Sequence, residues 1–245
     1  MVNIKSHAMI SVTDILHHFT TLFERWLPHS ADGEADLRQV LDELESAGEP
    51  QSFQAVVPPV VEEWLEKSCV LPCLPQHQAL IQALLEMGGS LRWFAPSADY
   101  AGDEMAQSYA FVRLIGPPLF GQEAAPFLSD NVIAGFTLQA PNILYPSHWH
   151  LAVEFYDTLS GTGLWQIGDG PFEAKPPGTL IHHPSNAPHA MQTTDTPMLN
   201  AFCWVGDILT RPVVAAGCCS RLLQKDLNED MAESERSEFS LKPTP

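Results

Sequence analysis

Chemically active side chains are concentrated in one part of the chain: five of the ten histidines lie between residues 148 and 189. The first group occurs in the run Tyr145-Pro-Ser-His148-Trp-His150-Leu-Ala-Val-Glu154-Phe-Tyr156. On a single strand, residues two apart point to the same face, so this spacing predicts that both imidazoles, the carboxylate and Tyr156 converge inside the domain. Burying such groups is costly unless something compensates them. Two histidines and a carboxylate suit a first-row divalent transition metal.

A fourth candidate ligand comes from the segment Gly178-Thr-Leu-Ile-His-His-Pro184-Ser-Asn186-Ala-Pro-His189, in which a tight turn would aim His189 from a neighbouring strand. The two segments together resemble the two-part cupin signature. They read His148-x-His150-x3-Glu154-x6-Gly161 and Gly178-x5-Pro184-x-Asn186-x2-His189. Asn142 and Asn186 stand where the signature has glycine, and asparagine is the residue after glycine that best tolerates positive φ.

A single histidine is more often a hydrogen-bonded structural residue than a ligand. Four ligand types at this spacing favour a metal instead, held by His148, His150, Glu154 and His189. His182 and His183 fall outside the signature and are interpreted as strand-end residues without a catalytic role.

Two of the four tyrosines flank the candidate ligands. Tyr156 shares the predicted inward face, and a divalent cation beside it would lower the pKa of its phenol from about 10. Tyr156 could then act as a general base near neutral pH. A packing tyrosine with a hydrogen-bonded hydroxyl, or a fifth metal ligand, remains an equally good interpretation of the spacing.

The elements that must position these residues change character along the chain. Apolar residues at three- and four-residue intervals predict helices over about 10–26, 37–44, 58–65 and 80–85. After Gly89, short β-branched and aromatic runs separated by Gly, Pro and Asn predict strands at 91–94, 109–115, 132–138, 150–156, 163–167 and 199–205. The prediction is a mainly β fold. It comprises a helical segment (1–89), a single jelly-roll-like cupin β-barrel (90–214), and a C-terminal helix with a charged tail (215–245).

The charge balance excludes some partners. With 12 Lys and Arg against 30 Asp and Glu, the formal net charge is −18. The scattered cations form no basic stripe for nucleic acid, and an anionic membrane surface would repel the chain. No run approaches a membrane span and no secretory signal is evident, so a cytoplasmic location is expected, with a monomer or homodimer as the assembly. Five cysteines in no zinc-binding spacing are expected to be reduced.

The run Y-P-x-H-x-H-x3-E-x-Y, followed by P-x-x-x-P-H-A-M, resembles the cupin-type dimethylsulfoniopropionate (DMSP) lyases. The resemblance implies a metal at His148, His150, Glu154 and His189, with Fe²⁺, Zn²⁺, Mn²⁺, Ni²⁺ or Co²⁺ as the ion. It implies Tyr156 as the base and Tyr145 as a second active-site tyrosine. The implied reaction is a β-elimination that yields dimethyl sulfide and acrylate.

DMSP is a zwitterion with a carboxylate at one end and a sulfonium at the other, and residues around the motif suggest how each end would bind. A sulfonium favours an aromatic wall. Trp149 should face outward by strand alternation, which leaves Trp165, Trp204 and Phe136 as candidates, although each is also a plausible core residue. Lys175 is the only cation between residues 114 and 210. A substrate carboxylate is therefore expected to depend on the metal.

Other functions fit the same ligands, because fold does not fix function. A cupin dioxygenase would use the four ligands with iron and O₂ and would not need Tyr156. An isomerase of anionic sugars or acids would want Lys or Arg near the site. A sensor or binding cupin would keep the metal and catalyse nothing.

Overall fold

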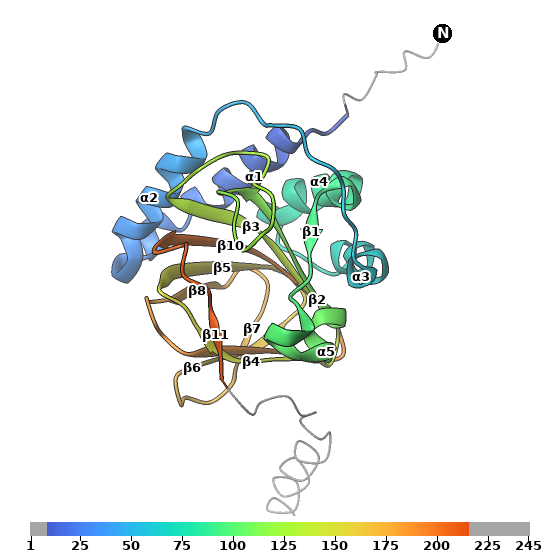
Figure 1. Ribbon diagram of the computed structural model, residues 1–245, viewed down its shortest axis with the longest axis vertical. Coiled ribbons are helices and arrows are strands. Elements are labelled where there is room, and N and C mark those ends of the chain that lie inside the picture. The colour runs from blue at the N-terminus through green and yellow to red at the C-terminus, as the bar shows by residue number, and fades with distance from the viewer. Residues whose placement is uncertain (1–8, 216–245) are drawn as a thin grey trace, which may run out of the picture.

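Helices come first along the chain. The computed structural model describes residues 9–215, and the predicted C-terminal helix and tail lie outside them from residue 216 on. The helices are α1 (Val12–Glu24), α2 (Glu34–Glu45), α3 (Pro59–Cys69), α4 (Gln78–Met87) and α5 (Ala98–Ser108). Short 3-10 turns lie at Leu27–His29, Ala31–Gly33, Pro75–His77 and Gly88–Ser90. In Figure 1 the helices α1 to α4 gather on one side of the strands.

The strands form two antiparallel sheets that face each other. The first has the order β1-β2-β3-β10-β5-β8 and the second β11-β4-β9-β6-β7. The first sheet comprises β1 (Trp93–Phe94), β2 (Tyr109–Ile115), β3 (Val132–Gln139), β5 (Ala152–Ser160), β8 (Leu180–His183) and β10 (Met198–Gly206). The second comprises β4 (Leu144–Trp149), β6 (Gly163–Ile167), β7 (Glu173–Lys175), β9 (His189–Thr193) and β11 (Val213–Val214). The fold is mainly β, with two cupin-type sheets behind N-terminal helices, as the sequence predicts, but the strands pair in two separate sheets rather than in one closed barrel.

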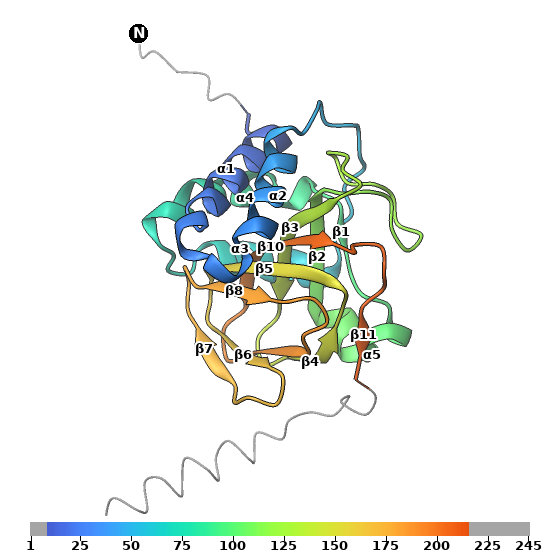
Figure 2. The ribbon, with the colours of Figure 1, turned by 90° about the vertical axis from the view of Figure 1, so that its left-hand side faces the viewer.

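The helices cover the outer face of the first sheet (Figure 2). The ring of Phe19 in α1 packs edge-on against Phe136 of β3, with 5.5 Å between centroids. On the same outer face, the fully buried carboxylate of Asp157 accepts a 2.7 Å hydrogen bond from Nε1 of Trp26 and lies 3.3 Å from Nε2 of His77. Because residues alternate along β5, this outward position of Asp157 turns Glu154 and Tyr156 toward the space between the sheets.

The expected single strand over the histidines is wrong, because the chain changes sheets there. β4 ends at Trp149 in the second sheet and β5 begins at Ala152 in the first, with His150 between them. The predicted ligands still converge, because the inner faces of the two sheets oppose each other. Two pairings fix their positions: His148 of β4 is opposite His189 of β9, and Glu154 of β5 lies between His183 of β8 and Trp204 of β10.

Several other elements differ from the sequence prediction. The strands β7 and β11 were not predicted, the strands β4, β8 and β9 were expected only at the histidines they carry and without bounds, and helix α5 interrupts the predicted barrel segment. Most of these elements are short, so a hydrophobic period is hard to recognise in them. The division at residues 89 and 214 stays a prediction. Among the described residues, no helix combines the length and apolar character that crossing a membrane requires.

Gly161, the last residue of the first signature segment, offers a test of the fold. Its φ is +75°, and an added Cβ would overlap the backbone oxygen of Pro197. Gly168, with φ +58°, has no neighbouring atom where its Cβ would stand. Left-handed backbone costs an L-residue about 1–2 kcal/mol. We expect Gly161→Ala to lower the free energy of unfolding in urea by clearly more than Gly168→Ala, and equal losses would contradict the close approach.

Candidate metal centre and active site

The carboxylate of Glu154 lies at the centre of the site. Its side chain is 1% exposed. One oxygen, Oε1, accepts a 2.5 Å hydrogen bond from Nε1 of Trp204. The other, Oε2, lies 3.0 Å from Nδ1 of His183 and 3.3 Å from Nε2 of both His150 and His189. Both oxygens of this buried carboxylate are therefore surrounded by nitrogen.

Three histidines are held in the same way. Nδ1 of His148, His150 and His189 lies 3.0, 2.9 and 2.9 Å from the backbone oxygens of Pro146, Ala152 and Ala187, respectively. A carbonyl oxygen only accepts, so each Nδ1 carries a proton, and Nε2 presents a lone pair whenever the ring is neutral. This is the usual arrangement of a metal-binding histidine, whose other nitrogen donates to a carbonyl or carboxylate.

The arrangement fits a cation. In the neutral tautomer, two Nε2 lone pairs, from His150 and His189, face one carboxylate oxygen at 3.3 Å. Acceptors facing each other in a buried space repel unless a proton or a cation lies between them. Nε2 of His189 is also buried without a hydrogen bond among the described residues. The chemistry of the donor set, imidazole nitrogen and carboxylate oxygen, suits a first-row transition metal.

The structure brings three of the four predicted ligands into one group. The ligand atoms of His150, Glu154 and His189 lie within 4.8 Å of one another. His148 lies beside this group rather than in it: its ring centroid is 4.1 Å from that of His189 and 6.3 Å from that of His150. On its other side, Tyr145 stacks on His148 at 4.1 Å with an interplanar angle of 10°.

The charges of the cluster favour an ionised carboxylate. Burial alone would raise the pKa of Glu154, but without a metal the charge of a protonated His150 and the hydrogen bonds from His150 and His183 hold that pKa well below its usual value. Burial would lower the pKa of His150, but Glu154 outweighs this effect and raises it. Burial and the neighbouring His189 put the pKa of His148 well below 6.5. Burial also lowers the pKa of His183 to about 4. At neutral pH, His148 and His183 are thus neutral beside a charged Glu154.

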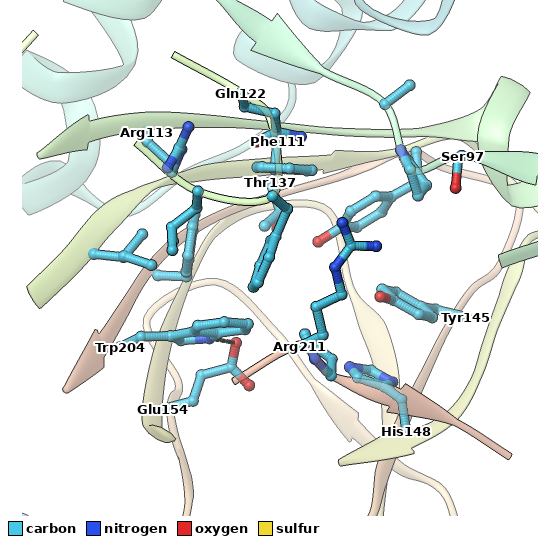
Figure 3. Close-up of a pocket in the computed structure, with 18 of the residues that line it drawn as sticks. Ser97, Phe111, Arg113, Gln122, Thr137, Tyr145, His148, Glu154, Trp204 and Arg211 are labelled. Atoms are coloured by element: carbon cyan, nitrogen blue, oxygen red, sulfur yellow. Dashed lines mark hydrogen bonds between the residues drawn. The ribbon is translucent and has the colours of Figure 1, made fainter. Parts of the chain in front are cut away.

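A cavity of about 430 Å³ opens onto this cluster. Its wall includes Glu154, His148 and both predicted tyrosines, Tyr145 and Tyr156, and its size suits a small-molecule site. Figure 3 shows Glu154 joined to Trp204 at one side of the cavity, with Tyr145 and His148 next to each other at the opposite side.

Tyr156 is a buried part of this cavity wall, with its ring 4.9 Å from that of Trp165. Burial raises the pKa of Tyr156 well above 10, and the negative charge of Glu154 raises it further. The protein residues alone therefore favour the protonated phenol. A divalent cation bound next to Glu154 would instead lower the pKa of Tyr156 and favour the phenolate.

Of the three candidate aromatic residues, only Trp204 lines the cavity. Phe136 faces away from it, toward the helices, because it stands on the outer face of β3 and contacts Phe19. Trp165 is buried beside Tyr156 without lining the cavity wall. Tyr109, Phe111, Phe120 and Phe202 add further aromatic side chains to the lining, and none of them was singled out from the sequence as a candidate for the sulfonium wall.

The cavity has cationic groups that the range 114–210 did not include. Arg113 and Arg211, just outside the residue range considered, both line it, and Figure 3 shows Arg211 extending toward its centre. Arg113 is 3% exposed, and its guanidinium donates to the backbone oxygens of Pro117 and Glu123. Burial lowers its pKa to about 10, so it remains cationic at neutral pH.

His183 is the functional candidate that sequence reasoning missed. It is fully buried between Glu154 and His189, whose ring it stacks on at 3.9 Å. His182 behaves as expected of a strand-end residue, since it lies on the opposite face and stacks on Phe155. The register of β8 against β5 distinguishes the two histidines. His183 is directly opposite Glu154 and therefore shares the inward face of Glu154.

Comparison with known proteins identifies the family of the chain. A family model described as dimethylsulfoniopropionate lyase matches residues 33–200. The chain belongs to the DMSP lyase family. The family match includes all four candidate ligands and both tyrosines. The chain is also 30% identical to the dimethylsulfoniopropionate lyase DddQ of Ruegeria pomeroyi over 139 residues, which cover 56% of this chain. It spans 66%, just under two thirds, of the length of that relative.

Two solved structures of DMSP lyases or from DMSP lyase studies have a similar fold. The crystal structure of the DMSP lyase DddQ from Ruegeria pomeroyi matches with a TM-score of 0.64 and 27% identity, covering 83% of this chain and 99% of that one. A second structure, from work on the DMSP lyases RdDddP and RnDddQII, matches with a TM-score of 0.65 and 24% identity, covering 84% of this chain and 100% of that one. The helices and the two sheets are therefore shared with structures from DMSP lyase studies.

The buried neutral histidines predict loss of stability in mild acid. With metal removed, unfolding exposes imidazoles whose pKa is about 6.5, whereas His183 in the folded protein binds a proton only near pH 4. The stabilisation is complete above pH 6.5 and is lost as the pH falls through this window. We expect the free energy of unfolding in urea with EDTA to fall between pH 7.5 and pH 5 by about 2 kcal/mol more in wild type than in His183→Leu, because the opposing contribution of His150, whose pKa is raised, is common to both proteins. An equal fall in the two proteins would contradict the neutral state assigned to His183.

Proposed function

We propose that this chain is a metal-dependent lyase that cleaves DMSP to dimethyl sulfide and acrylate, with Tyr156 as the base. One observation carries the proposal: Glu154, which belongs to the group with His150 and His189, lines the same cavity as Tyr156 in a member of the DMSP lyase family. The cavity also has aromatic walls and cationic groups, which together suit a zwitterion.

The proposed metal ligands are His148, His150, Glu154 and His189. The grouping of His150, Glu154 and His189 supports three of them, and His148 is the adjacent fourth. Fe²⁺, Zn²⁺, Mn²⁺, Ni²⁺ and Co²⁺ all suit these donors. When bound, a divalent ion would neutralise the substrate carboxylate as a Lewis acid and favour the phenolate of Tyr156.

The cavity residues suit the two ends of the substrate differently. Trp204, Phe202 and Phe111 offer aromatic faces, on which a desolvated sulfonium is stabilised by about 1–2 kcal/mol. Arg211 at the cavity wall attracts the carboxylate in a protein whose overall charge of −18 repels it. The burial of Glu154 and its histidines lowers the local dielectric constant, which strengthens electrostatic interactions with a ligand at the cluster.

The proposed chemistry is a β-elimination with one proton transfer. Oη of the Tyr156 phenolate takes the proton from the carbon next to the carboxylate. The electron pair of that C–H bond forms the new carbon–carbon double bond, and the bond from the β carbon to sulfur breaks. Dimethyl sulfide leaves with the sulfur electron pair, acrylate remains, and Tyr156 then returns the proton to solvent. Tyr145, which stacks on His148, is proposed as the second tyrosine of the site.

Activity measurements test the proposal directly. Purified protein given DMSP should release dimethyl sulfide and acrylate in equal amounts, and chelation of the metal should stop the release. Tyr156→Phe should reduce the rate by about 10²- to 10⁴-fold, the range for loss of a general base. Gas chromatography of the headspace measures the dimethyl sulfide.

The metal content of the same variant separates the roles of Tyr156. Retention of the wild-type metal content with loss of activity supports a base, whereas loss of the metal would identify Tyr156 as a ligand. If the metal-loaded wild type releases no dimethyl sulfide but consumes oxygen with another substrate, the chain is a dioxygenase and the proposed function is wrong.

A further inference from the structure

His183 differs from the other histidines of the site in which nitrogen it turns toward Glu154. His148, His150 and His189 use Nδ1 for a backbone carbonyl, which frees Nε2 as a ligand. His183 instead places Nδ1 at 3.0 Å from Oε2 of Glu154. A carboxylate only accepts, so Nδ1 of His183 carries the proton and acts as a donor. The geometry of His183 is that of a residue that holds a ligand rather than one that binds the ion.

Strand register makes this contact a fixed feature of the sheet. Glu154 on β5 has a direct neighbour on each side: His183 on β8 and Trp204 on β10. His183 donates to Oε2 and Trp204 donates to Oε1, so the two flanking strands hold the two oxygens separately. Two donors from opposite sides fix the plane of the carboxylate.

The surroundings of His183 leave its ring little freedom. Its side chain is fully buried, and it stacks on His189 with an interplanar angle of 19°. The ring of Tyr156 lies edge-on to it at 5.9 Å. His183 therefore contacts two proposed ligands and the proposed base while presenting no ligand atom to the group formed by His150, Glu154 and His189.

We propose that His183 is a positioning residue, which orients the Glu154 carboxylate for the metal through its Nδ1–H. The inference rests on the metal site proposed above. Hydrogen-bond partners of metal ligands typically contribute 10- to 100-fold to metal affinity. Loss of the His183 donor should therefore weaken metal binding, even though His183 is not a ligand.

The test is the dissociation constant of Zn²⁺, measured on the full chain by competition with a chromogenic chelator. His183→Leu, which removes the donor, should weaken binding by about 10- to 100-fold. His183→Asn, whose side-chain amide can take the place of Nδ1, should stay within about threefold of wild type. His182→Leu is the matched control on the opposite face of β8 and should leave the constant unchanged.

Each outcome decides the matter. If His183→Leu binds Zn²⁺ with wild-type affinity, the positioning role is overturned. Equal weakening in His183→Leu and His183→Asn also overturns it, because the packing of the ring would then matter instead of the donor. If His183→Leu does not fold, His183→Gln replaces it, since its longer side chain carries the amide past the position of Nδ1. A wild-type protein that binds no Zn²⁺, Fe²⁺ or Mn²⁺ would remove the metal site itself, a failure distinct from that of His183.

Discussion

The structure depends on one costly interaction, the burial of the ionised carboxylate of Glu154 between the two sheets. A buried charge is tolerated only when it is paired and hydrogen-bonded. Here one tryptophan and three histidines surround its two oxygens. Removing one partner of such a cluster leaves an uncompensated charge, which costs about 3–5 kcal/mol in comparable cases. Neighbours that stabilise a buried carboxylate also make it a ready ligand for a cation.

Two features of the fold determine the position of Glu154. The first is the change of sheet between β4 and β5, which places His148 on one sheet and Glu154 on the other. The second is register within the first sheet, which puts Trp204 and His183 directly on either side of Glu154. The helices support this arrangement from behind, because α1 and its following turn pack on the outer face of the same strands.

The sequence predicted the ligands better than it predicted how they come together. The spacing around His148 and Glu154 was sufficient to identify the candidate site, because ligand type and local spacing are recorded in the chain. The change of sheet at His150 was not predicted, because apolar and polar residues alternate in the same way whether the chain continues as one strand or crosses to the other sheet. His183 was missed because its importance comes from pairing with a residue far away in sequence. Arg113 and Arg211 were missed for the same reason: both line the cavity only after folding.

The central claim is that Glu154, with His150 and His189, forms a metal site between the sheets. Anomalous diffraction from crystals of the metal-loaded protein, collected at the absorption edge of the ion, tests it most directly. We predict one strong anomalous peak in contact with Oε2 of Glu154 and Nε2 of His150 and His189, with Nδ1 of His183 still donating to the carboxylate. Stoichiometric metal with its peak elsewhere, or a peak bonded to His183 while Glu154 remains uncoordinated, would contradict the account.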